Sequence, residues 1–478
     1  MKVLHIAAEC FPAAKVGGLG DVVGALPKYL NRIGIAAGVV LPKYGNTWLW
    51  KQQYKVIHKG QVNINGYKAN FIVEQELTDQ LGFTLFVIRM PDYFDRPGIY
   101  NDTQTGYGYA DSMDRWSAFQ QAALQWILTL GEKPDIIHCH DHHTALIPFM
   151  VKHCPAFDDL KYIPTIITIH NGVYQGVYPW SNYVKLPMFY AESRNLLDWN
   201  GLLNCLATGI KCAWQVTTVS HSYMEELARS SNGLEPLIKA EWSKCRGILN
   251  GIDSETWDPQ TDPRISYHYQ GNLIEYKLRN KKVITDNFHL NPRLPLISFI
   301  GRLVNEKGAD LLPEVIIQSI RRGFNAAFVI LGTGDKSLEQ EFKSMAWKYQ
   351  SVFNCAIAYD ETTAHQVYAG SDFIIMPSRV EPCGLNQMYA MRYGTIPIVR
   401  TVGGLKDTVW DYGDWEGRGF RFQQFNVEDC LHAISRALTV YYQPDEFRRL
   451  QNQDMQLDFS WITASENYKN MYNSLILN

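Results

Sequence analysis

The sequence lacks the features that mark several broad protein classes. Its nine cysteines are scattered and show no C-x-x-C spacing, which argues against a zinc ribbon or a thioredoxin-type site and fits a reducing compartment. No stretch approaches the roughly 18 consecutive apolar residues of a membrane span, and the first apolar run is too short for a signal peptide. With 45 Lys and Arg against 48 Asp and Glu, the net charge of −3 points to neither nucleic acid nor an anionic membrane as a partner. These absences predict a soluble, cytoplasmic protein.

The features that are present indicate a large globular α/β protein. Apolar residues make up 46% of the chain and charged residues 19%, and a length of 478 residues favours two or three domains. Short apolar runs alternate with helix-period segments, a pattern typical of parallel sheets covered on both faces. The sequence contains no repeat and no low-complexity tract.

The predicted strands fall into two series. The first series comprises Val3–Ala8, Ile35–Leu41, Phe83–Met90, Asp135–His140, Thr165–His170 and Gln215–Ser220. The second comprises Leu296–Ile300, Ala327–Leu331, Asn354–Ala358, Phe373–Pro377 and Thr395–Val399. Asn65-Gly66 predicts a type I′ hairpin between about Tyr54 and Leu77, and Ser337–Gln340 matches a helix capping box. This alternation of strands and helices predicts two doubly wound α/β domains with a cleft between them. In such domains ligands bind beyond the carboxyl ends of the strands.

Two segments of the first half carry candidate chemistry. The loop Lys15–Asp21 follows a strand and opens a helix, so its glycine amides suit a phosphate, although an ordinary glycine turn with a solvated lysine fits as well. His138–His143 (HCHDHH) closes another strand. Two histidines two apart share a strand face, so a metal site, a cluster that binds ligand hydroxyls and packed structural histidines all remain open. The same structural alternative applies to His170.

In the second half, two cations and a carboxylate follow strands. Arg302 and Lys307 suit a diphosphate leaving group, whose charge grows as its bond to carbon breaks; the alternative is a solvated pair with Glu306. Glu381 follows a later strand and is placed to hold sugar hydroxyls. Cys383 has no identifiable base nearby in sequence, which argues against a nucleophilic thiol.

Six motifs occur in order between residue 2 and about residue 410. They are KVGGLGDV (15–22), TIHNGVYQG (168–176), GILNGID (247–253), GRLVNEKG (301–308), SRVEPCGLNQMYAMRYGTIPIV (378–399) and TVGGLKDTV (401–409). With these six motifs in combination, the chain resembles the bacterial glycogen synthase and plant starch synthase family. The resemblance implies a GT-B fold, in which two Rossmann-like domains face each other across a deep cleft. It also implies retaining transfer of glucose from a sugar nucleotide, usually ADP-glucose, to the non-reducing-end 4-hydroxyl of an α-1,4-glucan such as glycogen, without metal or cofactor.

The resemblance also implies domain bounds and residue roles. The predicted domains are 1–246 on the acceptor side and 263–457 on the nucleotide-sugar side, with a hinge at 247–262 and a helix at 458–478 that packs back on the first. The implied catalytic residues are Lys15, His170, Arg302, Lys307 and Glu381. The implied sugar-nucleotide and acceptor contacts are Gly17, Gly18, Asp21, Asp141, His143, Asn250, Tyr359, Cys383, Gly384 and Leu385. Lys15, Arg302 and Lys307 would bind the diphosphate, Glu381 the glucose hydroxyls, His170 the reacting sugar and Tyr359 the nucleobase.

The sequence leaves two points of the chemistry open. The wider group of such transferases has a second glutamate eight residues after the first, where this chain has Tyr389, as bacterial glycogen synthases do. No clear carboxylate nucleophile can be identified, which favours a same-face displacement with the leaving phosphate as proton acceptor.

Two alternative functions remain. One is a related transferase with another donor or a small acceptor, such as a sucrose-type synthase. The other is an inactive glucan-binding scaffold.

Overall fold

A computed structural model describes residues 1–358 and 360–476 of the chain. The chain divides into two compact units, each of which is built from more than one segment. The first unit contains Met1–Val219, Met224–Ile248 and the segment from Trp461; the second contains Ser220–Tyr223 and Leu249–Ser460. Among the described residues, no helix combines the length and apolar character needed to cross a membrane.

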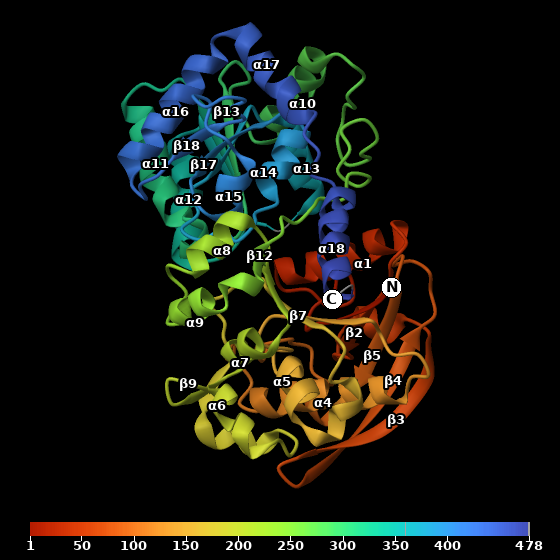
Figure 1. Cartoon of the computed structure of the whole chain (residues 1–478). Coiled ribbons are helices and arrows are strands. Elements are labelled where there is room, and N and C mark those ends of the chain that lie inside the picture. The colour runs from red at the N-terminus through yellow and green to blue at the C-terminus, as the bar shows by residue number, and fades with distance from the viewer. Residues whose placement is uncertain (359, 477–478) are drawn as a thin grey trace. The chain divides into compact units, whose positions relative to one another are not determined.

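The first unit is organised around a nine-stranded sheet of order β12-β11-β7-β6-β1-β2-β5-β4-β3 (Figure 1). Its strands are β1 Lys2–Ile6, β2 Ala36–Pro42, β3 Tyr54–Ile64, β4 Tyr67–Glu76, β5 Thr84–Arg89, β6 Ile136–His140, β7 Thr165–Ile169, β11 Gln215–Thr218 and β12 Cys245–Gly247. A small sheet holds β8 Val177–Pro179, β10 Leu202–Asn204 and β9 Asp198–Trp199. The helices are α1 Gly18–Arg32, α2 Thr47–Lys51, α3 Pro91–Phe94, α4 Ser112–Thr129, α5 Ile147–His153, α6 Arg194–Leu197, α7 Cys205–Cys212, α9 Glu235–Ala240 and α18 Trp461–Ile476. Helix α8 His221–Leu227 begins in the second unit and continues into the first from Met224.

Seven strands of the large sheet run parallel, and β3 and β4 add an antiparallel hairpin at one edge. The predicted hairpin is confirmed: Asn65 and Gly66 have φ of 50° and 85°, as a type I′ turn requires. One face of the sheet is covered by α1 and α18, which lie side by side in Figure 1 and share a core of apolar side chains with β1, β6 and β7. Helix α18 therefore follows the second unit in sequence but completes the core of the first.

The second unit has a six-stranded, fully parallel sheet of order β15-β14-β13-β16-β17-β18. Its strands are β13 Leu296–Ile300, β14 Ala327–Leu331, β15 Phe353–Ala356, β16 Phe373–Met376, β17 Ile396–Arg400 and β18 Phe420–Phe422. Its helices are α10 Leu273–Asn287, α11 Leu312–Arg321, α12 Lys336–Lys348, α13 Glu361–Gly370, α14 Asn386–Arg392, α15 Gly403–Thr408, α16 Val427–Tyr441 and α17 Pro444–Met455. In chain order the strands are arranged 3-2-1-4-5-6, the order of a doubly wound nucleotide-binding sheet.

The predicted capping box at Ser337–Gln340 is wrong. Helix α12 begins at Lys336, and Asp335 caps it by accepting a hydrogen bond from the Leu338 amide at 3.0 Å. Glu339 accepts the Gly334 amide at 2.9 Å, so it belongs to the cap as the fourth residue after Asp335. An aspartate just before the predicted start provides the cap instead of the serine.

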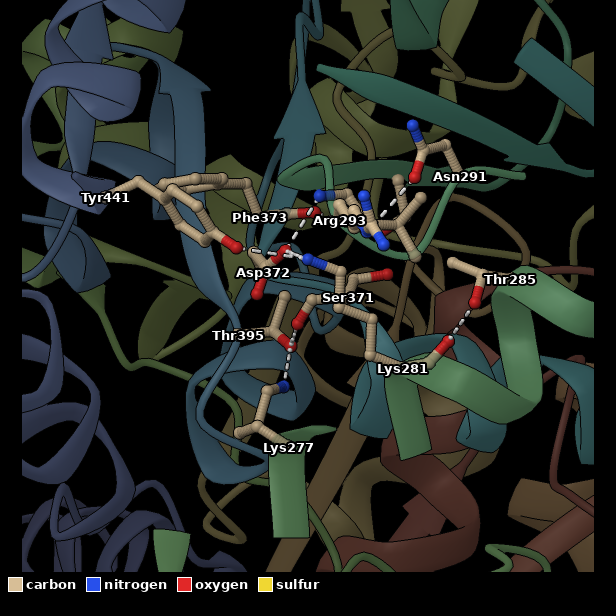
Figure 2. Close-up of polar contacts among 12 residues, drawn as sticks. Lys277, Lys281, Thr285, Asn291, Arg293, Ser371, Asp372, Phe373, Thr395 and Tyr441 are labelled. Atoms are coloured by element: carbon tan, nitrogen blue, oxygen red, sulfur yellow. Dashed lines mark hydrogen bonds and ion pairs between the residues drawn. The ribbon is translucent and has the colours of Figure 1, made fainter. Parts of the chain in front are cut away.

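The amino ends of the second sheet are held by two buried lysines of α10 (Figure 2). Lys281 donates to Asp372, just before β16, at 2.6 Å, and the same carboxylate oxygen accepts the amide of Leu296 at the start of β13 at 2.7 Å. Lys277 donates to the Thr395 hydroxyl, just before β17, at 2.8 Å. These bonds tie α10 to the ends of three strands on the edge opposite the one where ligands of such sheets bind.

Candidate active site

The predicted site residues of the first unit follow β1, β6 and β7 at the carboxyl end of the sheet. After β1 the chain continues to β2 on one side, whereas β6 pairs with β1 on the other. The boundary between β1 and β6 is therefore the topological switch point, where sheets of this kind bind ligands. Next to this point, the residues after β6 and β7 contact each other, because the Asp141 carboxylate accepts the His170 amide at 2.7 Å.

The glycine loop that opens α1 is held by a carboxylate that the sequence analysis did not single out. Glu9, which is 3% exposed, accepts the amides of Val16 at 2.6 Å and Gly17 at 2.8 Å. Its other oxygen accepts the Tyr100 hydroxyl at 2.5 Å. The Gly17 amide is thus bonded within the protein, while a Cβ added at Gly18 would meet nothing within 4 Å. No motif marked Glu9, because its partners are two backbone amides and a tyrosine 91 positions away in the sequence.

Lys15 forms an ion pair with Asp21 across the first turn of α1. Its ammonium lies 2.6 Å from the Asp21 carboxylate, and both side chains are 31% exposed. An ion pair that is this accessible to water contributes little to stability. The lysine charge therefore lies at the start of α1, beside the helix N-terminus, where an anion would also be favoured.

Asp141 has an unusual backbone and a perturbed carboxylate. Its φ is +55°, a left-handed conformation that aspartate adopts more readily than most residues. Burial raises the pKa of Asp141 to about 7, although the amides of His170 and Asn171 donate to the carboxylate and oppose the shift. A strained backbone and a carboxyl group that titrates near neutral pH are both typical of functional sites.

His143 and His170 are buried rather than solvated. The His143 ring stacks on Tyr100 with centroids 4.7 Å apart and meets the edge of Trp116 at 4.6 Å. The ring of His170, which is 8% exposed, forms a hydrogen bond of 3.0 Å through Nε2 to Nδ1 of His140. Burial lowers the pKa of both histidines, that of His170 to about 3, so both are neutral at neutral pH.

Three buried histidines lie close enough together to be considered as a metal site. One nitrogen from each of His5, His138 and His140 falls within a group 4.8 Å across. Five of the six ring nitrogens already form hydrogen bonds, to Tyr472, to Thr168 or to another histidine. Only His5 Nε2 is without a partner among the described residues. This donor set fits a metal poorly, and the expectation that the protein needs no metal stays a prediction.

In the second unit, the loops after β13 and β16 pack directly against each other. These strands are neighbours, and the chain leaves them in opposite directions, so this is again a switch point. The Arg379 amide donates to the Glu306 carbonyl at 2.9 Å. Gly308 has φ +67°, and a Cβ there would lie 2.0 Å from the Pro377 carbonyl oxygen. Glycine at 308 therefore permits the close approach of the two loops.

Lys307 and Glu381 form the central polar contact of this edge. The Lys307 ammonium donates to both Glu381 oxygens at 2.7 and 2.8 Å, and the Ser378 hydroxyl donates to one of them at 2.9 Å. The glutamate side chain is 6% exposed and the lysine 24%. Arg302 is more open, at 64% exposure, and lies 3.6 Å from Glu306. The structure thus joins two predicted catalytic residues that are 74 positions apart.

The turn Cys383–Leu385 leads from Glu381 into α14, with Leu385 at the N-cap and Gly384 at φ +71°. Gly404 of α15 packs against this turn, because a Cβ there would lie 1.9 Å from the Cys383 carbonyl oxygen. Burial raises the pKa of the Cys383 thiol to about 12, which leaves it protonated at neutral pH. This agrees with the argument against a nucleophilic thiol.

Asn250 and Tyr389 also belong to the second unit. The buried side-chain oxygen of Asn250 has no hydrogen-bond partner in the described part of the chain. Tyr389 stacks on Trp257 with ring centroids 3.7 Å apart, so it forms part of an aromatic cluster where related transferases have a carboxylate. Tyr359, the predicted nucleobase contact, lies outside the described residues.

Comparisons with known proteins cover the whole chain. The family model for the starch synthase catalytic domain matches residues 2–240, and the model for group 1 glycosyl transferases matches residues 280–452. The glycogen synthase of Flavobacterium johnsoniae is 44% identical over 478 residues, with 100% of this chain and 99% of the relative covered. This chain belongs to the glycogen synthase and starch synthase family.

Other members of the glycogen synthase family and solved structures agree. The glycogen synthase of Geobacillus stearothermophilus is 38% identical, covering 100% of this chain and 98% of the relative. The catalytic domain of starch synthase IV from Arabidopsis thaliana, solved with ADP and acarbose, has a TM-score of 0.87 at 32% identity and covers 100% and 99% of the two chains. Sucrose-phosphate synthase from Thermosynechococcus elongatus, with a TM-score of 0.61 at 16% identity over 100% and 99% of the two chains, shares the fold. The predicted family and the predicted GT-B fold are both confirmed.

Proposed function

We propose that this chain transfers glucose from ADP-glucose to the non-reducing-end 4-hydroxyl of an α-1,4-glucan, with retention of configuration. The observation that carries this proposal is the bonding of Lys307 to Glu381 at the switch point of the second sheet, in a chain of the glycogen synthase family. The starch synthase IV structure, described as bound to ADP and acarbose, supports ADP as the nucleotide. We further propose that the enzyme acts in the cytoplasm, with neither a nucleic acid nor a membrane as partner.

Cations of both units are proposed to stabilise the diphosphate as it leaves. In the first unit we assign this role to Lys15 and to the Gly18 amide, since the Gly17 amide is bonded to Glu9. In the second unit we assign it to Arg302 and Lys307, together with the amides of the turn that leads into α14. Preorganised positive charge that meets developing negative charge lowers the barrier without a reorganisation cost.

The sugar and the acceptor are assigned to polar side chains. Glu381 accepts hydrogen bonds from glucose hydroxyls, for which its two oxygens have lone pairs beyond those used by Lys307. His170 contacts the reacting sugar. Asp21, Asp141, His143 and Asn250 are proposed as further sugar or acceptor contacts, and Tyr359 remains the proposed nucleobase contact. The domain bounds and the hinge at 247–262 also stay predictions.

The proposed chemical step is a displacement on one face of the sugar. The bond from the anomeric carbon to the phosphate oxygen breaks, the bond to the acceptor 4-oxygen forms on the same face, and the leaving ADP takes the hydroxyl proton. No carboxylate nucleophile is needed, and Glu381 and Glu9 are both engaged by hydrogen bonds in the protein. A trapped covalent glucosyl-enzyme would overturn this mechanism.

The proposal is tested by offering ADP-glucose and UDP-glucose side by side, with glycogen as acceptor and release of nucleoside diphosphate as the readout. We expect glucan elongation through α-1,4 linkages, faster with ADP-glucose. In Lys15→Ala, elongation should fall by about 30-fold to 1000-fold, the scale of losing one charge stabiliser. Transfer to fructose but not to glycogen would favour the sucrose-type alternative, and no transfer to any acceptor would favour a glucan-binding scaffold.

A further inference from the structure

A row of imidazoles leads from the interior of the first unit to His170. Residues 5, 138, 140, 168 and 170 share one face of the sheet, because side chains alternate along β1, β6 and β7 and the strands are paired in register. His5 Nδ1 lies 3.0 Å from His140 Nε2, and His140 Nδ1 lies 3.0 Å from His170 Nε2. We call His5, His140 and His170 the imidazole row.

His138 lies beside the row without belonging to it. Its ring stacks on His140 with centroids 4.5 Å apart, but its nitrogens bond to the Tyr472 hydroxyl at 2.8 Å and to the Thr168 hydroxyl at 2.6 Å. The row is therefore a chain of three rings joined by two hydrogen bonds. His138 takes no part in these two bonds and can be compared with the three rings that do.

Every ring of the row is neutral at neutral pH. Burial lowers the pKa of His5 and of His170 to about 3, and that of His140 well below its usual value, where the neighbouring histidines add to the effect. A neutral imidazole carries one N–H and one lone pair, so each ring can donate through one nitrogen only. The two bonds of the row must consequently run in the same direction.

The direction of the two hydrogen bonds follows from the environment of His5, at the buried end of the row. His5 Nε2 is buried and has no partner within the described chain. Buried N–H groups without an acceptor are rarer than buried acceptors without a donor. The His5 proton therefore lies on Nδ1 and is donated to His140, and His140 donates its own Nδ1 proton to His170.

We propose that His5 and His140 are positioning residues that fix His170 as the tautomer with its proton on Nδ1. The His170 Nε2 lone pair then accepts from His140 and is not available to act as a base. Within the proposed function, on which this role rests, His170 offers the sugar a hydrogen-bond donor for a hydroxyl oxygen. The acceptor's proton must then go elsewhere, in accord with its transfer to the leaving phosphate.

Nuclear magnetic resonance measures the tautomer of His170 directly. The enzyme is labelled with 15N-histidine, and long-range 1H–15N correlation spectra are recorded without substrate at neutral pH, with His170→Gln used to assign the signals. We expect a protonated Nδ1 and an unprotonated, hydrogen-bonded Nε2 for His170. A protonated Nε2, or a charged ring, would overturn the proposal.

Variants of His5 separate positioning from packing. His5→Phe keeps a ring but removes the donor, so His170 should become a mixture of tautomers and kcat should fall about threefold to tenfold, the scale of one hydrogen bond. His5→Asn retains an N–H near the position of Nδ1 and should keep the wild-type tautomer and most of kcat. A wild-type tautomer in a folded His5→Phe protein would contradict the proposal, and if that variant does not fold, the wild-type and His5→Asn spectra decide.

Two controls complete the design. Tyr472→Phe removes a hydrogen bond from His138 on the same face and should leave the His170 tautomer unchanged. Addition of Zn²⁺ should move no signal of His5, His138 or His140; stoichiometric zinc with shifted signals would mean a metal site and overturn the row. Because the spectra need no substrate, failure of glucan synthesis with an Nδ1-protonated His170 would refute the proposed function and leave the tautomer assignment standing.

Discussion

Two lysine–carboxylate pairs lie at opposite ends of the second unit's sheet, and they differ in the burial of the cation. At the amino ends Lys281 and Asp372 are 5% and 8% exposed (Figure 2). At the carboxyl ends Glu381 is just as buried, at 6%, but Lys307 is 24% exposed. The two ion pairs have nearly the same length, 2.6 and 2.7 Å. Distance alone therefore does not distinguish a structural pair from a pair proposed to act on substrate.

The difference lies in what else each pair contacts. Burial alone would lower the pKa of Lys281, but the charge of Asp372 and the interaction with Tyr441 outweigh it and raise the pKa above its usual value. Asp372 also accepts the Leu296 amide and Lys281 donates to the Tyr441 hydroxyl, so the pair connects α10 to β13 and to α16. The Lys307 side chain is partly exposed, and we propose that it turns toward a phosphate when the donor binds. Chemically similar pairs thus serve the fold at one edge and, as we propose, the reaction at the other.

The largest expected effect is on stability at the amino ends. Asp372→Ala leaves the Lys281 charge and the Leu296 amide buried without their partner, which should lower the free energy of unfolding by about 3–5 kcal/mol. Urea unfolding followed by circular dichroism measures this loss. The double variant Lys281→Met/Asp372→Leu should recover most of it, because no unpaired buried charge remains. A loss below about 1 kcal/mol, the range of surface pairs, would mean that the pair does not hold the fold.

The second-largest expected effect is on turnover, when Lys307 is changed at the carboxyl ends of the strands. Lys307→Ala should remove about 2–4 kcal/mol of transition-state stabilisation, or about 30-fold to 1000-fold in kcat/KM. The protein should still fold, with a smaller loss of unfolding free energy than Asp372→Ala, because removal of the 24% exposed Lys307 side chain opens the Glu381 carboxylate to water and the Ser378 hydroxyl still donates to it. Lys336→Ala, at an 86% exposed lysine paired with Glu339, is the matched control and should be silent in both assays. Turnover of Lys307→Ala close to that of wild type would remove its assigned role.

A smaller effect concerns the pH dependence of stability. Burial lowers the pKa of Lys277 in the folded protein to about 7, from 10.5. Between these values the unfolded chain binds more protons, so the free energy of unfolding should rise with pH by about 1.4 kcal/mol per unit, with no such slope below pH 7. Lys277→Met should remove this slope and be the more stable protein at pH 7.

Urea unfolding at pH 7, 8 and 9 tests the slope as a difference between wild type and variant, so that other titrating groups cancel. Lys282→Met, at an exposed position of the same helix, is the control and should leave the slope intact. An equal slope in wild type and Lys277→Met would show that Lys277 stays charged in the folded state.

The smallest effect is expected at Cys383. Cys383→Ser should keep turnover within about threefold of wild type, because the buried, protonated thiol belongs to a turn and takes no part in bond making. Steady-state assays with ADP-glucose and glycogen measure it. Loss of activity on the scale of Lys307→Ala, in a folded protein, would reopen the question of thiol chemistry.

Much of the fold could be predicted because the central strands are continuous apolar runs. The predicted strands at 296–300 and 327–331 have the bounds of β13 and β14, and the Asn65-Gly66 turn determines its hairpin by its own backbone preference. The cap of α12 was missed because two overlapping polar patterns compete over a few residues, and sequence alone does not say which side chain reaches the amides.

The site could be predicted only where a motif carries it. Lys307 and Glu381 come from recognisable motifs, and the structure joins them. Glu9 and Asp372 could not be found this way, because each binds partners far away in sequence or backbone amides that leave no sequence signal. The imidazole row likewise depends on strand order: His5 meets His140 because β1 and β6 are neighbours in the sheet although 135 positions separate the two rings.

The return of α18 to the first unit has a consequence for biosynthesis. Trp461, Tyr468 and Tyr472 belong to the core beneath α1, yet the ribosome makes them only after the whole second unit. During translation this face of the first sheet, which carries the histidines and the apolar side chains of Val3 and Ile136, is covered by α1 but lacks α18 while the second unit is synthesised. The unit that is synthesised first is completed last, so a nascent chain stalled before Trp461 leaves part of this apolar core without its α18 partners, which is the kind of exposed surface that favours aggregation.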